Sequence, residues 1–154
     1  MEVSGLIRTT LPPDVLVSAL RDARTLSRLL PDGSKLDQIA EGRFSFSVTK
    51  AVGPIRLTLP GQMTLTPKGK GHDQTLSARA SHLIGGKVDL DLDLTIEHHG
   101  GHTRLAYSGE LVATGLAGRV LREHRARANS ALKAALTRLK MHAEGQMRQS
   151  NPQA

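Results

Sequence analysis

The segment VDLDLDLTI, residues 88–96, alternates between apolar and acidic or polar side chains over its whole length. Successive side chains of a β-strand point to opposite faces, so the pattern predicts a strand with Val88 and Ile96 on the same face and Asp89 on the other. Such alternation is typical of an antiparallel sheet that has one face against the core and the other in water.

Further alternating runs extend from this segment in both directions, from Leu36 to about Ala113, and one more precedes them near Val3. Turn signals separate them: Glu41-Gly42, Gly53-Pro54, the polar run 67–73, Gly85-Gly86 and the hairpin tip 98–102. Together they predict an antiparallel sheet of about seven strands. Pro60 lies inside one run and favours an edge or a bulge there, because proline lacks the N–H that a strand ladder needs.

Helical spacing is found at both ends of this strand region. Two short helices are expected between Pro13 and Leu30, and one continuous long helix from Gly115 to about Met141, roughly 40 Å in length. Its predicted buried stripe is Leu116, Val120, Leu121, Ala128, Ala131, Leu132, Ala135, Leu136 and Leu139. Many strands followed by one helix predict an α+β fold with the helix on one sheet face. We expect one domain over residues 1–142 and a polar tail over 143–154.

Composition narrows the class of protein. The chain has no cysteine, so disulfides and thiol chemistry are excluded. Neither a signal peptide nor an apolar run of about 18 residues is recognisable, and a cytoplasmic protein is expected. The net charge is +7, and most of the excess falls after Gly115. There, eight basic residues (Arg119, Arg122, Arg125, Arg127, Lys133, Arg138, Lys140 and Arg148) face two acidic ones, Glu123 and Glu144.

Several stretches resemble one known family. They are MEVSG (1–5), LPDG (30–33) followed by Leu36, VGPI (52–55) leading to GQMTL (61–65), Gly85-Gly86, and TRLAY (103–107). The element order resembles the helix-grip fold of START lipid-transfer domains, birch-pollen-allergen relatives and the SRPBCC superfamily. The stretches are similar to those of the CoxG family, named after the G subunit of carbon monoxide dehydrogenase. Its aromatic positions in the first helix and near the end of the long helix are occupied here by Leu16, Leu136 and Leu139.

This resemblance implies a carrier or accessory protein. CoxG members are associated with molybdenum-containing CO dehydrogenases and related hydroxylases, with membrane recruitment and with quinone-like lipids. Other SRPBCC proteins carry hydrophobic ligands or are polyketide cyclases. We therefore expect non-catalytic binding of a hydrophobic small molecule between sheet and helix, without a cofactor or metal.

The candidate ligand-binding residues are those with inward strand or helix phase. They are Leu57, Leu59, Met63, Ala80, His82, Leu90, Leu92, Tyr107, Leu111, Ala128 and Leu132. Most are apolar, and an apolar cavity prefers an apolar ligand. Small residues on both sides also leave open a second outcome, in which helix and sheet close on each other without a cavity.

Two other functions remain open at this point. His82 and Tyr107 are the polar side chains of inward phase, and they would serve a cyclase-like or hydrolase-like enzyme. The basic C-terminal helix would suit a peripheral adaptor on an anionic membrane or an acidic protein. Nucleic acid is not expected, because stacking aromatics are scarce. His98, His99 and His102 are interpreted as a solvated turn, and Asp89, Asp91 and Asp93 as cross-strand partners of Arg79 and Arg104.

Overall fold

A computed structural model describes residues 1–52, 54–82, 86–123 and 125–150. Within these ranges the side chains of Lys50, Ala51, Val52, Ile55, Leu57, Val120 and Ser150 lie outside the description. The elements in chain order are β1 (Glu2–Thr9), α1 (Pro13–Leu20), α2 (Ala23–Leu26), η1 (Ser27–Leu29), β2 (Lys35–Ala40), β3 (Arg43–Val52), β4 (Ile55–Pro67), β5 (Gln74–His82), β6 (Gly86–His99), β7 (His102–Thr114), α3 (Gly115–Glu123) and α4 (Arg125–Ser150).

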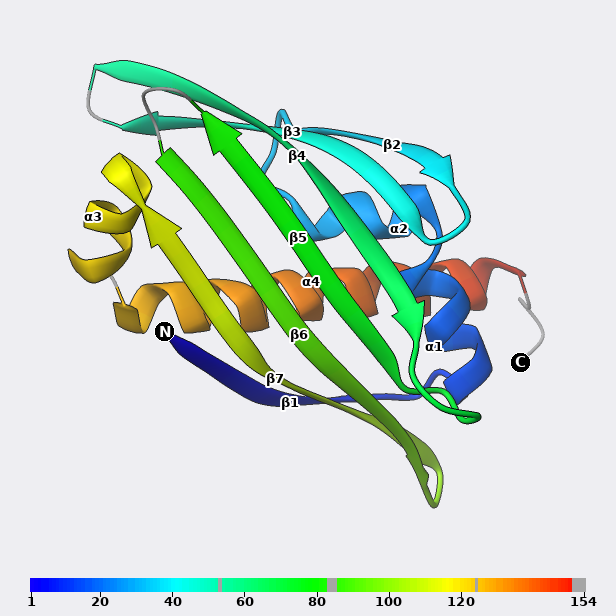
Figure 1. Ribbon diagram of the computed structural model, residues 1–154. Helices are drawn as coiled ribbons and strands as arrows, with labels where there is room; N and C mark the ends of the chain where they lie inside the picture. Colours follow the sequence, from blue (N-terminus) through cyan, green and yellow to red (C-terminus); the bar gives the residue numbers. More distant parts are fainter. Residues whose placement is uncertain (53, 83–85, 124, 151–154) are drawn as a thin grey trace.

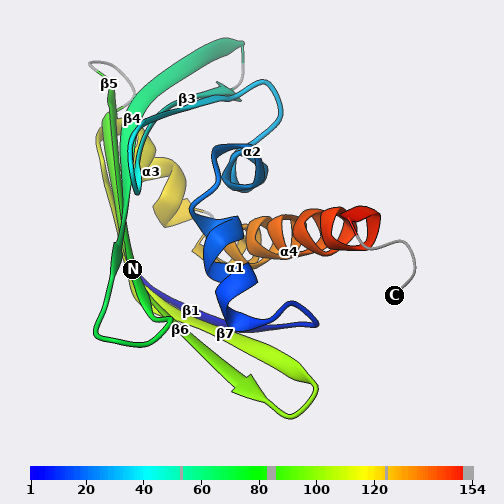
Figure 2. The ribbon, with the colours of Figure 1, turned by 90° about the vertical axis from the view of Figure 1, so that its right-hand side faces the viewer.

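The seven strands form one antiparallel sheet in the order β1-β7-β6-β5-β4-β3-β2. Figure 1 shows the long strands crossing in front of the helices, and Figure 2 shows that the sheet curves around them. The helices therefore lie on the concave face. The predicted α+β helix-grip architecture, with short helices after the first strand, is confirmed.

The residues at the start of each short helix after β1 favour helix initiation. Pro13 occupies the first turn of α1, where its missing N–H has no helical acceptor to lose. Asp22 caps α2, since its carboxylate accepts hydrogen bonds from the backbone N–H and the hydroxyl of Thr25 at 3.1 and 3.0 Å. The buried side chains of these helices, Leu16, Leu20 and Leu26, pack into the core.

The sheet divides at Pro60. β4 pairs with β3 from Ile55 to Thr64, but it pairs with β5 only from Gly61 to Pro67. The next opposite position would join Pro60 to Ser81, and proline has no N–H to donate there. Figure 1 shows the β3–β4 hairpin bending away from the tip of β5. The expected edge at position 60 is confirmed, and we call this division the fork.

The C-terminal helical region differs from the sequence prediction in direction and length. Helix α3 ends at Glu123, α4 begins at Arg125, and the two run in different directions, so one continuous helix is not formed. α4 continues beyond Met141 to Ser150, and Ala143 is buried against the core. Ala131 was expected in the buried stripe, but it is exposed, because the buried face of α4 is centred on Leu132, Leu136 and Leu139.

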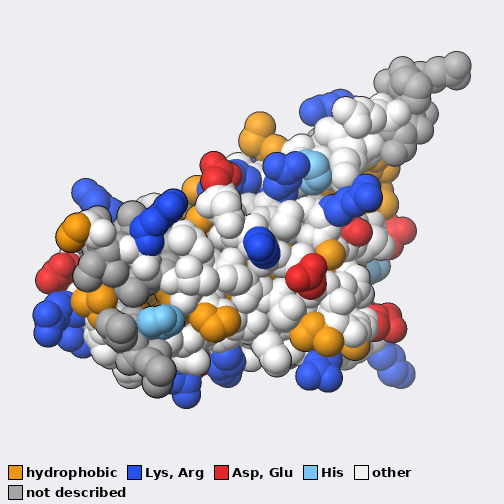
Figure 3. Space-filling view, turned by 90° about the horizontal axis from the view of Figure 1, so that it is seen from above, with side chains coloured by type: hydrophobic (Ala, Val, Ile, Leu, Met, Phe, Trp, Pro, Cys, Tyr) orange, Lys and Arg blue, Asp and Glu red, His pale blue; other side chains and the backbone are white. Residues whose placement is uncertain are grey.

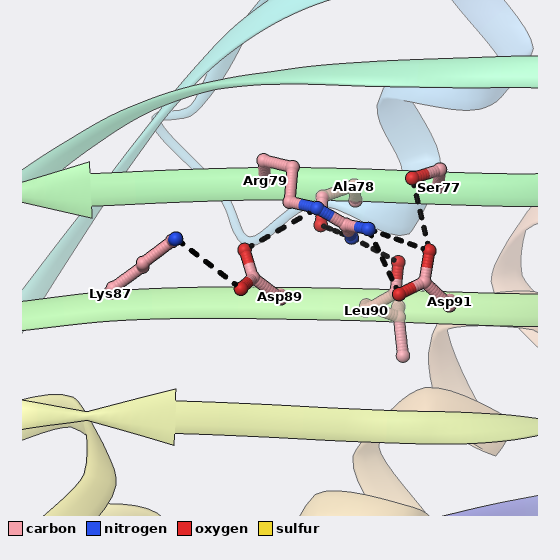
Figure 4. A network of polar contacts seen from close by, with 7 residues as sticks. All are labelled: Ser77, Ala78, Arg79, Lys87, Asp89, Leu90 and Asp91. Carbon is pink, nitrogen blue, oxygen red and sulfur yellow. Dashed lines mark hydrogen bonds and ion pairs between the residues drawn. The ribbon is translucent and has the colours of Figure 1, made fainter.

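Several ion pairs lie on the convex face. The alternating Asp residues of β6 predict those that involve this strand. Arg79 on β5 reaches both Asp89 and Asp91 on β6, the latter through two hydrogen bonds of 2.9 Å (Figure 4). These hydrogen bonds hold the pKa of the Asp91 carboxyl below its usual value. Asp93 pairs instead with Lys68 at 3.3 Å. Within the described residues, Arg104 has no ion pair, so its predicted role as partner is wrong.

A candidate ligand cavity between the sheet and the helices

The concave face is built from rows of side chains that cross the sheet at equal height. One row joins Leu65, Leu76, Leu92, Gly109 and Val3 from five adjacent strands. Its apolar side chains are 2 to 4% exposed. This row belongs to the core, where α1, α2 and the second half of α4 cover the sheet. We call this part of the fold the closed half.

Burial decreases toward the other end of the same strands. The row Phe46, Gly61, Ala80, Val88 and Ala113 faces inward like the first, but every member is only half-buried. The row between them ends in Leu90 and Leu111, which are also half-buried. Inward-facing apolar side chains thus retain contact with open space here. We call this part the open half.

The helices above the open half leave it partly uncovered. Helix α3 contacts β6 and β7, and its apolar residues Leu116 and Leu121 are half-buried. The backbone of helix α4 runs nearest to β1, η1 and the short helices. In its first half, Ala128 and Leu132 are half-buried, whereas Leu136 and Leu139 further along are 2% and 1% exposed.

The structure separates the predicted ligand-binding residues into two groups. The half-buried residues, which line the open half or its end, are Leu59, Ala80, His82, Leu90, Leu111, Ala128 and Leu132. Met63, Leu92 and Tyr107 are packed in the closed half, at most 4% exposed. The side chain of Leu57 lies outside the described residues. Strand phase predicts which face of the sheet a residue occupies, but it carries no information on how deeply the residue is buried.

His82 and Tyr107 are far apart. Tyr107 pairs with Leu94, which pairs with Gln74 at the start of β5. His82 lies eight residues further along β5 than Gln74. A strand rises about 3.3 Å per residue, so the two positions are roughly 26 Å apart. One substrate bond cannot lie within proton-transfer distance of both groups. The structure therefore does not assemble the acid–base pair of the enzyme alternative.

Two buried polar atoms on the concave side have no hydrogen-bond partner within the described residues. The Tyr107 hydroxyl lies over Gly5 of β1, and burial raises the pKa of this phenol. The second atom is Oδ1 of Asn129, on the half-buried face of α4 between Ala128 and Leu132. Sequence reasoning missed Asn129 because it is polar within an apolar stripe. Its spacing of three residues from Leu132 was the available signal.

The histidines of the hairpin tip lie at the surface. His98 and His99 are exposed, and His99 lies 3.2 Å from the Glu97 carboxylate and stacks on His102. Across the part of the chain that the structure describes, no cluster of three His, Cys, Asp or Glu residues is placed to hold a metal ion.

The sequence matches the model of a known family over most of its length. A family model described as the carbon monoxide dehydrogenase G subunit (CoxG) matches residues 5–147. The chain belongs to the CoxG family. Among curated proteins, no sequence matches this CoxG-family chain. The matched residues include those of the fork and of the open half.

Solved structures similar to this CoxG-family protein share its fold at low sequence identity. A conserved protein from Geobacillus kaustophilus superimposes with a TM-score of 0.79 at 15% identity, over 94% of this chain and 96% of that one. The Zhui aromatase/cyclase from Streptomyces sp. R1128 gives 0.69 at 15% identity, over 98% of both chains. A STAR-related lipid transfer protein from Xanthomonas axonopodis gives 0.62 at 15% identity, over 93% and 85%.

Proposed function

We propose that this CoxG-family protein binds a hydrophobic small molecule, a lipid or quinone-like compound, between the sheet and the helices without chemical conversion. The observation that carries the proposal is the fall in burial along the concave face. Leu92 is 2% exposed, whereas Leu90, two residues earlier on the same strand and face, is only half-buried. Apolar surface that stays accessible inside a curved sheet gains dispersion contacts and loses contact with water when an apolar ligand covers it.

The comparisons agree with a carrier. One similar structure is named as a STAR-related lipid transfer protein, and the family name refers to CO dehydrogenase. An accessory role toward a molybdenum hydroxylase of the CO dehydrogenase type is therefore part of the proposal. The separation of His82 and Tyr107 argues against the cyclase-like or hydrolase-like alternative, although a neighbouring fold is an aromatase/cyclase.

The test is to fill the space and measure binding. The chain has no tryptophan, so one introduced indole is also the only such fluorophore. Leu90→Trp should lower the affinity for a dansyl-labelled fatty acid at least about tenfold. The stability change should stay below about 1 kcal/mol, because open space accepts the ring, whereas overpacking a closed core costs about 1–3 kcal/mol. Ala131→Trp, on the exposed face of α4, is the matched control and should bind like the parent.

Native mass spectrometry of protein purified from its own host would then identify the natural ligand. A parent protein that binds no probe, together with a Leu90→Trp variant that mainly loses stability, would show that the open half is closed in solution. These two results together would contradict the proposed binding of a hydrophobic ligand.

A second candidate function, attachment to an anionic membrane surface, has its own observation. The basic side chains of α3 and α4 other than Lys140 and Arg138 are exposed and without an ion pair within the described residues. Arg138 is also exposed, and its Nε donates to the carbonyl of Arg28 on η1 at 3.3 Å, so basic residues of two elements adjoin. Figure 3, which views the molecule from the β2–β4 side, also shows more Lys and Arg than acidic side chains on that face. Within the described residues, no helix has both the length and the hydropathy to cross a bilayer.

A further inference from the structure

A groove of about 320 Å³ opens on the convex face, at the fork where β4 and β5 separate. One wall is formed by residues of β4 and the other by residues of β5, with Lys87 of β6 beside them; the β4 and β5 residues are Pro60, Gly61, Gln62, Thr64, Ser77, Arg79, Ala80 and Ser81. The ladder between these strands ends at Gly61 and Ala80, beside the residue that has no N–H. From there the groove extends over the paired positions Gln62/Arg79 and Thr64/Ser77.

The floor of this groove is the reverse side of the cavity floor. Gly61 and Ala80 belong to the inward-facing row of the open half, yet they also line the outer groove. On the concave side the ring of Phe46 lies over Gly61, 2.5 Å from where a Cβ would stand. Phe46 itself is half-buried. Gly61 and Ala80 are the last paired residues of β4 and β5, so the outer groove and the open half can meet only beyond this pair, at the fork.

The rim of the groove is polar. The Gln62 amide, the Ser81 hydroxyl and the Lys87 ammonium group border it, and the Lys87 side chain is 62% exposed. Lys87 approaches Asp89 only at 3.8 Å, so its charge remains available. The Arg79 guanidinium is instead engaged by Asp89 and Asp91 and ties β5 to β6 beside the fork (Figure 4). The rim therefore offers hydrogen-bond donors for an oxygen-bearing group.

We propose that the fork is the passage into the cavity and the site where the ligand's polar head is held. The ligand is then an amphiphile, with an apolar chain against the open half and an oxygen-bearing head at Gln62, Ser81 and Lys87. This inference rests on the proposed binding function, and it adds the route of entry and the head-group chemistry. A head with carboxylate or carbonyl oxygens fits the rim, since all three side chains donate hydrogen bonds.

The passage is tested by closing it. Because the chain has no cysteine, the pair Pro60→Cys and Ser81→Cys forms a single defined disulfide across the fork. Oxidation should slow uptake and release of a dansyl-labelled fatty acid by roughly tenfold or more, as for other gated sites, and reduction should restore both rates. The control pair, Thr66→Cys and Thr75→Cys, lies at facing positions of the β4–β5 ladder outside the groove, and its oxidation should change neither rate. Ser81→Trp, which fills the groove without a crosslink, should slow uptake as well.

The head-group site is tested with two probes that differ only in the head, a fatty acid and the alkane of equal chain length. Lys87→Gln should weaken fatty-acid binding about two- to fivefold, as expected for an exposed charge pair, and leave alkane binding unchanged. Equal effects on both probes would overturn the head-group assignment. A parent that binds the probe while the closed fork changes no rate would overturn the passage alone. A parent that binds no probe would overturn the proposed function and this inference with it.

Discussion

Tyr107 is the residue whose environment is least explained by packing alone. Its ring lies across Gly5 on the neighbouring edge strand, in the space that any side chain at position 5 would need. Position 5 must therefore be glycine for the Tyr107 ring to fit, and the ring covers the backbone of Gly5. Tyr107 is only 2% exposed, and the hydroxyl at the end of its ring has no partner among the described residues.

Replacing Tyr107 by Phe should leave the free energy of unfolding at neutral pH unchanged or raise it by up to about 1 kcal/mol, because an unpaired buried hydroxyl carries a desolvation cost. At alkaline pH the difference should grow. Burial raises the pKa of this phenol above its unfolded value of about 10, so the unfolded state loses the proton first and parent stability falls from about pH 10 upward. The Phe variant lacks this contribution.

Urea unfolding of both proteins at neutral and alkaline pH measures the effect. Tyr107 is the only tyrosine, so the absorbance of tyrosinate reports its titration directly. A Phe variant that loses more than about 1 kcal/mol at neutral pH would mean that the hydroxyl has a partner, such as an internal water.

Among the secondary-structure elements, strands and helices differed in how well the sequence predicted them. Each strand carries its own period of two, and position 60 carried its own proline, so strand faces and the fork edge were readable locally. The long helix was not, because its two apolar stripes meet different partners. Leu116 and Leu121 face β6 and β7, whereas Leu136 and Leu139 pack in the core, where α4 meets β1 and η1. Periodicity reports an apolar face but does not say which surface covers it.

Two helical glycines should respond oppositely to alanine. In α3, a Cβ at Gly118 would stand 2.5 Å from the Ala113 carbonyl oxygen, so Gly118→Ala should lift the helix from β7 and lower stability by about 1–3 kcal/mol. In α4, a Cβ at Gly145 would meet nothing nearer than the Arg148 guanidinium at 4.0 Å. Gly145→Ala should raise stability by up to about 1 kcal/mol through helix propensity.

Thermal unfolding of the two variants measures whether each substitution raises or lowers stability. Each variant is the control for the other, since both make the same substitution within a helix. If Gly118→Ala is also stabilising, α3 is not held against the sheet as closely as its backbone contact with β7 implies.

On the scale of the whole molecule, the architecture was predictable and the openness of the core was not. Strand order, helix side and inward faces follow from alternation and from the order of elements. Whether Leu90 is covered depends on the direction in which α4 leaves the sheet, and that direction is set by contacts with η1 and β1 that are far apart in sequence. The same reason explains why Ala131 was assigned to the wrong side of α4.

The distribution of charge is also a property of the whole molecule, and it predicts salt-dependent attachment to lipid. Substituting Arg119, Arg122, Lys133 and Arg138 by Gln should abolish co-sedimentation with anionic vesicles, since each charge contributes about 1 kcal/mol near such a surface. Parent binding should weaken between low and physiological salt, as the Debye length falls from about 30 to 8 Å.

The matched control removes the same number of charges elsewhere, at the exposed residues Arg8, Arg43, Arg56 and Lys70. It should co-sediment like the parent, and neither protein should bind neutral vesicles. Equal loss in both variants would show that net charge alone, rather than this surface, governs binding.

The pairing of β1 with β7 has a consequence for co-translational folding. Every other adjacent pair in the sheet is a hairpin of consecutive strands, but Glu2 pairs with Glu110 and Thr9 with Thr103. β1 is synthesised before its partner, which emerges roughly 100 residues later, a wait of about 5–20 s at ordinary rates of translation. During that interval the strand that contains Val3 and Ile7 has no partner. Once β7 has been made, β1 pairs with it and covers its free edge. Completion of the sheet is thus deferred until β7 has been made, and β1 stays accessible to chaperones during that interval.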